Sequence, residues 1–282
     1  MRPVQYRAQI EAWLREDLGR AGDLTSAAIV DPHQVADADL VARAGGVIAG
    51  LDIALEIFRT LDADLTINQT VTDGQVVEAG TVLVKLSGNA LALLGAERTA
   101  LNLLGRLSGI ATATRAVTDA VAGTGAVVAD TRKTTPGLRM FEKHAVRMGG
   151  GANHRFGLDD AVMIKDNHVA LAGSVTAAVK AARARVGHIV KIEVEVDTLE
   201  QLDELLRNPV DIVLLDNMAP DELRRAVAMV DGRMVTEASG GITIDTAAEV
   251  ASTGVDILSV GWITHSATNL DVALDVNYDT ST

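Results

Sequence analysis

The sequence predicts an α/β protein in which a small α+β region precedes a parallel α/β sheet. From about residue 125 to 260, apolar strand-like runs alternate with helical patterns, which is typical of parallel strands joined by right-handed crossovers. Apolar residues make up 48% of the chain and aromatic residues only 2%. The core is therefore expected to consist of Ala, Val, Leu and Ile, as barrel interiors commonly do. The 282 residues suffice for one large domain or two.

Composition excludes several classes of function. A formal net charge of −13 argues against a nucleic-acid partner, because phosphate backbones are held mainly by Lys and Arg. The chain has no Cys, which rules out disulfides, thiolate zinc sites and a cysteine nucleophile. The charged N-terminus does not resemble a signal peptide, and no uncharged run approaches the roughly 20 residues of a membrane helix. We therefore expect a cytoplasmic protein that does not bind membranes.

The first third of the chain predicts a small α+β domain. Apolar residues at helical spacing over 4–18 predict a helix that ends at Gly19 and Gly22. The polar residues 23–26 are expected to form a loop. Short alternating runs between residues 35 and 95 predict strands around one helix. The expected strands are 37–43, 76–77 and 81–86, and the expected helix is 51–60.

A long helix or a kinked helix pair is expected over residues 91–120. Gly105 and Gly109 lie inside it among many other small residues. This composition predicts that another helix approaches closely.

The repeating unit after residue 125 predicts six parallel strands. Such a set of strands could close partly or wholly into a barrel. The expected strands are 126–130, 160–165, 189–196, 211–215, 234–238 and 256–260. The expected helices are about 138–149, 174–186, 198–207, 219–230 and 245–253.

Polar residues and glycines follow these strands. In a barrel of this kind, chemistry gathers at the carboxyl ends of the strands. Five of the six expected strand ends carry polar or charged groups, and two are rich in glycine, although stability requires neither. The strand ends are Thr131 to Thr134, Lys165 to His168, Glu195 to Asp197, Asp216 and Asn217, Ser239 to Gly241, and Gly261.

Positive charge is concentrated in residues 131–168, which hold seven Lys or Arg against four acids. An acidic protein that collects cations at strand ends is expected to bind an anion. Arginine forks suit planar carboxylates, and lysine suits phosphate. Lys143 and Arg147 are interpreted as a solvated helix face. The candidate ligand-binding cations are Arg132, Lys133, Arg155 and Lys165.

Two acidic residues end successive strands. Neighbouring strands lie about 4.8 Å apart, so Glu195 and Asp216 can reach one site. They are candidate Mg²⁺ ligands, although they could instead hold ribose hydroxyls or cap the next helices. Glu193 alternates onto the same face as Glu195, and the pattern does not say which of the two reaches the site.

Glycine-rich turns follow the last two strands. Backbone N–H groups in such turns commonly hold phosphate. Ser239, Gly240, Gly241 and Gly261 are therefore candidate phosphate ligands. His265 is equally compatible with phosphate contact or packing, and His33 and His188 are interpreted as inert surface residues.

These motifs together resemble those of the quinolinate phosphoribosyltransferase family. The resemblance covers about residues 16 to 270, and its ordered set of blocks is more specific than any single block. The main blocks are Asp130 to Arg139 (DTRKTTPGLR), Gly149 to Arg155 (GGGANHR) and Ile164 to His168 (IKDNH). The others are Glu97 to Asn102, Leu107 to Thr112, Glu193 to Val196, Leu214 to Asn217, Glu237 to Gly241, and Val260 with Gly261.

The resemblance implies an N-terminal α/β sandwich over residues 1–112 and an open, incomplete α/β barrel over 113–282, with a last helix that returns to the first domain. It also implies transfer of a phosphoribosyl group from phosphoribosyl pyrophosphate to quinolinate, with decarboxylation. The products would be nicotinate mononucleotide, pyrophosphate and carbon dioxide, in de novo NAD biosynthesis. The family is further expected to form homodimers with shared active sites, and a larger assembly is left open.

Residue roles follow from the same resemblance. Quinolinate would be held by Thr131, Arg132, His154, Arg155 and Lys165, with Arg98 reaching in from a partner chain. The catalytic groups would be Lys133, Lys165, Glu195 and Asp216, with Mg²⁺ on Glu195 and Asp216. Ser239, Gly240, Gly241 and Gly261 would bind the 5-phosphate.

Three other functions compete with this interpretation. The first is a related phosphoribosyltransferase for another acceptor, such as nicotinate, or the paralogue associated with molybdenum transport. The second is an unrelated phosphate-binding barrel lyase or synthase. The third is a carrier module, because Asp73 to Gly80 resembles a biotinyl or lipoyl turn; a carrier, however, needs a lysine at a hairpin tip, and Lys85 falls inside an expected strand.

Overall fold

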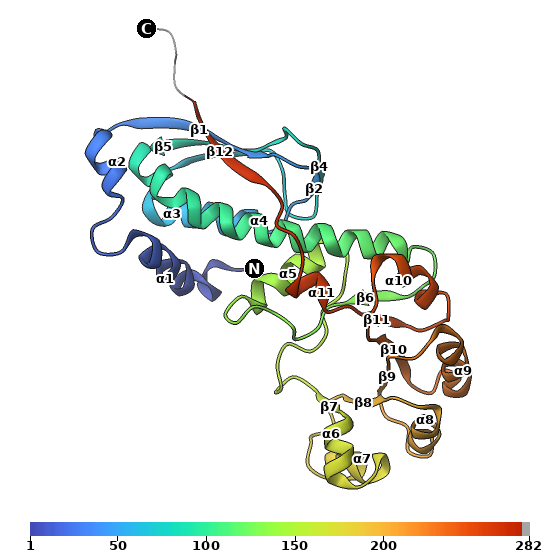
Figure 1. The fold of residues 1–282 in the computed structure, drawn as a ribbon. Coiled ribbons are helices and arrows are strands. Elements are labelled where there is room, and N and C mark those ends of the chain that lie inside the picture. Colours follow the sequence, from blue (N-terminus) through green and yellow to red (C-terminus); the bar gives the residue numbers. More distant parts are fainter. Residues whose placement is uncertain (278–282) are drawn as a thin grey trace. The chain divides into compact units, whose positions relative to one another are not determined.

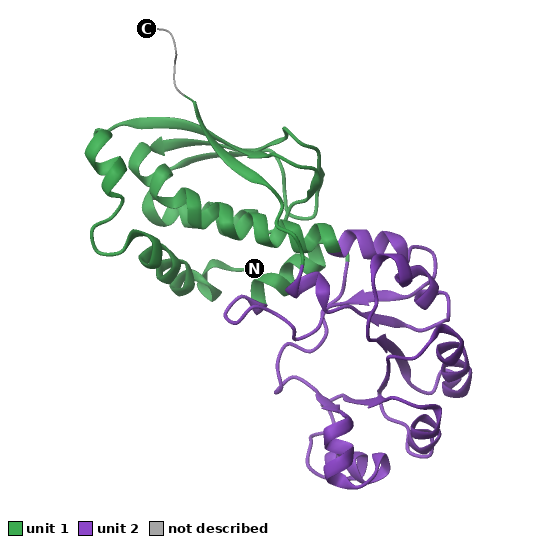
Figure 2. Ribbon diagram, viewed as in Figure 1, with its two compact units in different colours: residues 1–113, 140–150, 267–282 green, residues 114–139, 151–266 purple. Residues whose placement is uncertain are grey.

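The computed structural model describes residues 1–277, and the chain divides into two compact units (Figure 2). Unit 1 consists of residues 1–113, 140–150 and 267–282. Unit 2 consists of residues 114–139 and 151–266. Each unit is therefore built from segments that are not contiguous in the sequence.

Unit 1 begins with a short 3-10 helix η1 (Pro3–Gln5) and two helices, α1 (Arg7–Leu18) and α2 (Leu24–Ile29). The predicted loop over residues 23–26 is wrong, because Asp23 caps α2 by accepting hydrogen bonds from the backbone N–H groups of Thr25 and Ser26. These residues thus start a helix rather than form a loop.

The main sheet of unit 1 has four antiparallel strands in the order β12-β1-β5-β3. They are β1 (Val35–Ala42), β3 (Thr66–Gln69), β5 (Val82–Asn89) and β12 (Val272–Asn277). A second small sheet pairs β2 (Gly46–Val47) with β4 (Val76–Val77). The segment that returns to this unit is therefore a strand, β12, and not the expected helix.

Helices α3 (Leu51–Leu61) and α4 (Ala90–Ala120) lie on one side of the main sheet (Figure 1). This layer of helices against strands is the predicted α/β sandwich. Large apolar side chains such as Ile53, Phe58 and Leu83 are almost completely buried in it. Burial of such side chains supplies most of the stabilisation of a unit like this.

The 31 residues of α4 form one continuous helix. Of the two predicted alternatives, the single long helix is confirmed and the kinked helix pair is not. The small residues allow a close approach, as expected, but the segment that approaches them is not a helix. A Cβ at Gly109 would lie 2.1 Å from the carbonyl oxygen of Thr268, so the extended chain before β12 passes directly over the helix.

Within residues 1–277, no helix combines the length and hydropathy needed to cross a bilayer.

Unit 2 contains six parallel strands in the order β6-β11-β10-β9-β8-β7. All six predicted strands are confirmed. The two outer strands, β6 and β7, do not pair with each other, so the barrel stays open. The strands are β6 (Val127–Ala129), β7 (Val162–Ile164), β8 (Ile192–Val196), β9 (Ile212–Asp216), β10 (Val235–Ser239) and β11 (Ile257–Ser259).

Helices α7 to α10 lie along the outer side of this curved sheet (Figure 1). Each buries an apolar stripe, for example Leu202 and Leu205 in α8. These four helices and α5 were predicted, whereas the short helices α6 and α11 were not. The helices are α5 (Arg139–Met148), α6 (Asp166–Ala172), α7 (Val175–Arg183), α8 (Leu199–Leu206), α9 (Pro220–Val230), α10 (Ile244–Ala251) and α11 (Trp262–His265).

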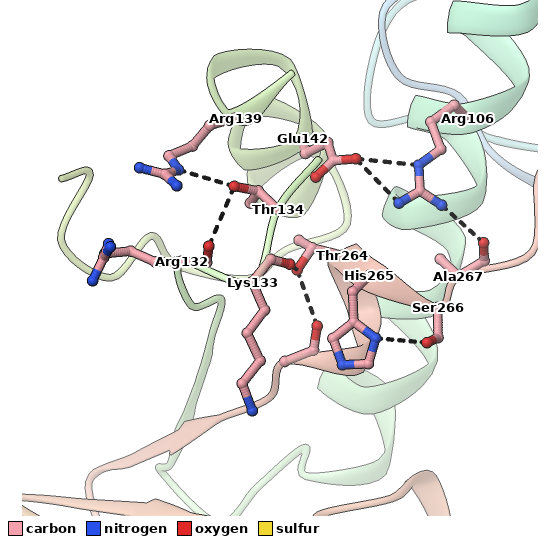
Figure 3. Close-up of polar contacts among 11 residues, drawn as sticks. Arg106, Arg132, Lys133, Thr134, Arg139, Glu142, Thr264, His265, Ser266 and Ala267 are labelled. Atoms are coloured by element: carbon pink, nitrogen blue, oxygen red, sulfur yellow. Dashed lines mark hydrogen bonds and ion pairs between the residues drawn. The ribbon is translucent and has the colours of Figure 1, made fainter. Parts of the chain in front are cut away.

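A buried ion pair joins α5 to α4 within unit 1. The Glu142 side chain is fully buried, and its Oε1 accepts hydrogen bonds from Nε and Nη2 of Arg106 at 3.2 and 3.1 Å (Figure 3). Arg106 also donates to the carbonyl oxygen of Ala267. One guanidinium therefore ties together three segments that are distant in the sequence.

Replacement of Arg106 by Met should lower the free energy of unfolding by about 3–5 kcal/mol, because the buried carboxylate loses its guanidinium. Urea denaturation followed by circular dichroism measures this change. The control is Arg98→Met, because Arg98 lies on the same helix with 64% of its side chain exposed. That control should cost no more than about 0.5 kcal/mol. Equal destabilisation by the two changes would contradict the assignment.

Candidate active site

A cavity of about 730 Å³ opens at the carboxyl ends of the unit 2 strands. Every residue that lines it belongs to unit 2. The lining residues that sequence analysis assigned to the site are Thr131, Arg132, Lys133, His154, Arg155, Lys165, Glu195, Asp216, Ser239, Gly240, Gly241 and Gly261. The parallel sheet thus brings all of the predicted site residues of this unit into one pocket.

The chain after β6 places two cations at the pocket. Thr131 Oγ1 accepts a hydrogen bond from the N–H of Lys133, which shapes the turn. Thr264 in α11 donates through its hydroxyl to the carbonyl oxygen of Lys133 (Figure 3). Nε of Arg132 is buried and has no hydrogen-bond partner among the described residues. A buried donor of this kind is costly to leave unpaired, so it is available to an acceptor on a ligand.

A buried aspartate positions the glycine-rich segment that carries Arg155. Asp130 is completely buried and accepts hydrogen bonds from Asn153 Nδ2 at 2.7 Å and from the N–H of His154 at 2.9 Å. The Arg155 guanidinium donates to the carbonyl oxygen of Ala161. Burial, followed by repulsion from Arg132, lowers the pKa of Arg155. The two guanidinium groups therefore lie close enough to repel, which favours an anion between them.

A histidine and two buried glutamates lie on one side of the pocket. His154 Nδ1 accepts a hydrogen bond from the N–H of Arg155 at 2.7 Å. Its Nε2 therefore carries the proton, and it lies 3.1 Å from Glu193 Oε2 and 3.5 Å from Glu237 Oε1. Glu193 and Glu195 lie on the same face of β8, as the alternation predicted. Their environments differ, because Glu195 lines the pocket whereas Glu193 is buried beside His154.

The ligand atoms of His154, Glu193 and Glu237 lie within 4.8 Å of one another, a spacing that could hold a metal ion. A proton can neutralise the same cluster. Burial and the charge of Glu193 raise the pKa of Glu237 to about 7. Glu237 was not assigned to the site from the sequence, although its place two residues before Ser239 on β10 is the signal that could have found it.

Glu195 and Asp216 provide carboxylate oxygens at adjacent strand ends. Glu195 Oε2 is paired with the Lys165 ammonium, and Asp216 Oδ2 accepts a hydrogen bond from Asn217 Nδ2. In residues 1–277 the second oxygen of each carboxylate has no hydrogen bond. Hard oxygen donors of this kind fit Mg²⁺, which usually keeps several waters and takes one or two carboxylates.

Steric constraints explain why glycine occupies three positions at the pocket. Gly240 and Gly241 have φ values of 95° and 62°, a region that side chains rarely adopt. A Cβ at Gly261 would lie 2.9 Å from Cδ of Lys133, so the lysine stem runs across this glycine. The Trp262 indole donates to the carbonyl oxygen of Ile242 and joins the two glycine turns. His265 also lines the pocket, with Nδ1 2.6 Å from Ser266 Oγ.

The other residues singled out from the sequence lie elsewhere. Arg98 belongs to unit 1 and is mostly exposed. Lys143 is only 3% exposed, so its interpretation as part of a solvated helix face is wrong, whereas Arg147 is exposed as expected. His33 and His188 are exposed and lie outside the pocket lining.

The unit 2 fold and its pocket define a class of protein. An open parallel barrel that gathers cations, carboxylates and glycine turns at its strand ends is the architecture of an enzyme that acts on a phosphorylated substrate. Comparison with protein families narrows this class. The N-terminal domain of quinolinate phosphoribosyl transferase matches residues 23–108, and its C-terminal domain matches residues 110–275. The chain therefore belongs to the quinolinate phosphoribosyltransferase family.

Individual relatives agree with this assignment over nearly the whole chain. A probable nicotinate-nucleotide pyrophosphorylase (carboxylating) of Bacillus subtilis is 45% identical, covering 98% of this chain and 95% of the relative. The nicotinate-nucleotide pyrophosphorylase (carboxylating) of Mycobacterium leprae is 46% identical, with 96% of each chain covered. The crystal structure of NadC from Streptococcus pyogenes superposes with a TM-score of 0.96 at 40% identity and covers 99% of both chains.

The Glu237→Gln variant should gain stability relative to the wild type as the pH rises from 5 to 8. The folded-state pKa of about 7 lies above the ordinary value of 4.5, so the folded protein binds more protons in this window and loses stability as the pH rises. Glutamine is neutral throughout and does not show this loss. Thermal melting at a series of pH values measures the difference.

The matched control for this pH series is Glu249→Gln, an exposed position on α10. Its difference in melting temperature from the wild type should stay constant across the same range. A constant difference for the Glu237 variant as well would show that this carboxyl does not titrate there.

Proposed function

We propose that the chain transfers a phosphoribosyl group from phosphoribosyl pyrophosphate to quinolinate and releases carbon dioxide and pyrophosphate to give nicotinate mononucleotide, a step of NAD biosynthesis. The observation that carries this proposal is the convergence, in one pocket, of cations suited to a diacid with carboxylates and glycine turns suited to a phosphorylated sugar. Membership in the quinolinate phosphoribosyltransferase family supports the same reaction.

In this proposal the cations hold quinolinate. The close guanidiniums of Arg132 and Arg155 and the Lys165 ammonium, with the Thr131 hydroxyl, bind the two carboxylates. Both ring nitrogens of His154 already have partners. A direct contact of this ring with the diacid therefore requires exchange of one of those bonds; otherwise His154 serves to hold Arg155.

The phosphoribosyl donor occupies the opposite part of the pocket. Backbone N–H groups of Ser239 to Gly241 and of Gly261 bind the 5-phosphate, and Lys133 binds the pyrophosphate. Glu195 and Asp216 hold Mg²⁺ or the ribose hydroxyls. Bound Mg²⁺ would offset the negative charge of the pyrophosphate.

The chemistry requires no side-chain nucleophile. The ring nitrogen of quinolinate forms a bond to the anomeric carbon as the bond from that carbon to pyrophosphate breaks, and pyrophosphate keeps the electron pair. The ring nitrogen becomes cationic and accepts the electrons left when the 2-carboxylate departs as carbon dioxide. A proton then takes its place on the ring. The protein therefore contributes positioning and fixed charges.

A homodimer with shared sites completes the proposal. Arg98 is exposed on unit 1, and none of the unit 1 residues that the structure describes lines the pocket. We propose that Arg98 acts on the pocket of a second copy. Assembly beyond the dimer and a cytoplasmic location stay predictions from the sequence.

The first experiment is product analysis with quinolinate labelled at the 2-carboxylate, phosphoribosyl pyrophosphate and Mg²⁺. The wild type should release labelled carbon dioxide and form nicotinate mononucleotide. Lys165→Ala should lower kcat/KM by roughly 10²–10³-fold, because a charge in the pocket is lost. Lys191→Ala, at the opposite end of β8 with 69% of its side chain exposed, should turn over normally. Turnover of nicotinate instead of quinolinate would reject the proposed acceptor.

The shared site is tested by mixing two inactive variants. Arg98→Ala and Lys165→Ala should each keep no more than about 1% of wild-type activity alone. Unfolding and refolding them together should restore about a quarter of wild-type activity, because half of the chains form mixed dimers and each mixed dimer holds one intact site. Two differently tagged Lys165→Ala chains, refolded together, serve as the control. Failure to recover activity after co-purification has shown exchange would reject a shared site.

A further inference from the structure

Asn217, the residue after β9, has an unusual backbone. Its φ is 53°, and among the described residues only Asp231 is another non-glycine with positive φ. Asp231 is the C-cap of α9, where this conformation commonly ends a helix. Asn217 caps no helix and instead lines the pocket. The backbone of Asn217 is therefore held in a left-handed conformation at the active site.

Three contacts of Asn217 join two parts of the pocket. Its Nδ2 donates to Asp216 Oδ2 at 2.5 Å. Its backbone N–H donates to the carbonyl oxygen of Ser239 at 2.9 Å and extends the pairing of β9 with β10 by one residue. Its Oδ1 lies only 2.1 Å from where a Cβ of Gly240 would be. One amide side chain thus lies between a carboxylate and the first glycine turn.

The left-handed backbone is what allows these contacts together. At this position after the end of β9 the side chain reaches both the Asp216 carboxylate and the Gly240 turn that follows β10. Asparagine tolerates this conformation better than other residues with a side chain, and glycine tolerates it best. If Asn217 served only to provide this left-handed backbone, glycine could replace it without loss of substrate affinity or stability.

We propose that Asn217 is a positioning residue for the phosphoribosyl donor. This inference rests on the proposed function, in which Asp216 holds the ribose or its metal and the Ser239 to Gly241 turn holds the 5-phosphate. Asn217 sets the separation of these two parts by orienting the Asp216 carboxylate and by packing against Gly240. It acts through these neighbours and not on the reacting atoms.

Steady-state kinetics of Asn217→Gly and Asn217→Asp test this role. Glycine keeps the backbone and removes the amide, whereas aspartate keeps the shape and the backbone preference but loses the donor. Each variant should raise KM for phosphoribosyl pyrophosphate by about tenfold, because a hydrogen bond to a charged acceptor is lost. KM for quinolinate should change by less than about twofold, since its cations are untouched. The melting temperature of the glycine variant should not fall.

Asp231→Gly is the matched control. This change also places glycine at a left-handed backbone position, but at the C-cap of α9, outside the pocket lining. Its kinetic constants should equal those of the wild type.

Two results would overturn the inference. One is unchanged kinetics for the phosphoribosyl donor in the glycine variant. The other is an equal rise in KM for both substrates together with a lower melting temperature, which would indicate a structural role only. Because the wild type is assayed in parallel, either result with normal wild-type turnover rejects the role of Asn217 and leaves the proposed function intact. A wild type without quinolinate turnover rejects the proposed function itself.

Discussion

Parallel pairing of the six unit 2 strands is the constraint on which the pocket depends. Because all six strands run in the same direction, the residues that follow them meet at one edge of the sheet. The register places Asp216 opposite Ser239 on neighbouring strands, and Val196 opposite Leu215. Residues from segments more than 100 positions apart in the sequence consequently share one cavity.

Charge compensation is the second requirement of this edge. Burial and, after it, repulsion from Arg132 lower the pKa of Arg155, and Lys165 lies in the same pocket. The carboxylates of Glu193, which is buried nearby, and of Asp160 offset part of this positive charge at Arg155. The protein thereby keeps cations close together for an anionic ligand and lowers the cost of burying them beside one another.

Much of this arrangement could be predicted from the sequence. The six strands were found because their apolar runs and turn residues are local signals, and the residues that follow them were then found by position alone. Other features carry no local signal. The strand β12 pairs with β1 more than 200 residues away, and the small Gly109 admits the chain at Thr268, not a helix. Asp23 looked like part of a loop because a helix cap has the same polar composition as a turn.

The sequence by itself determined the class of fold, the strand ends that carry chemistry and the family motifs, because these depend on residue type and spacing along the chain. Only the tertiary structure decided which of Glu193 and Glu195 faces the pocket, that Lys143 is buried, and that Asn217 lies between Asp216 and Gly240. The physical reason is that alternation predicts on which face of a strand a side chain lies, but not how deeply it is buried. Burial and contacts depend on neighbouring residues that come from distant positions in the sequence.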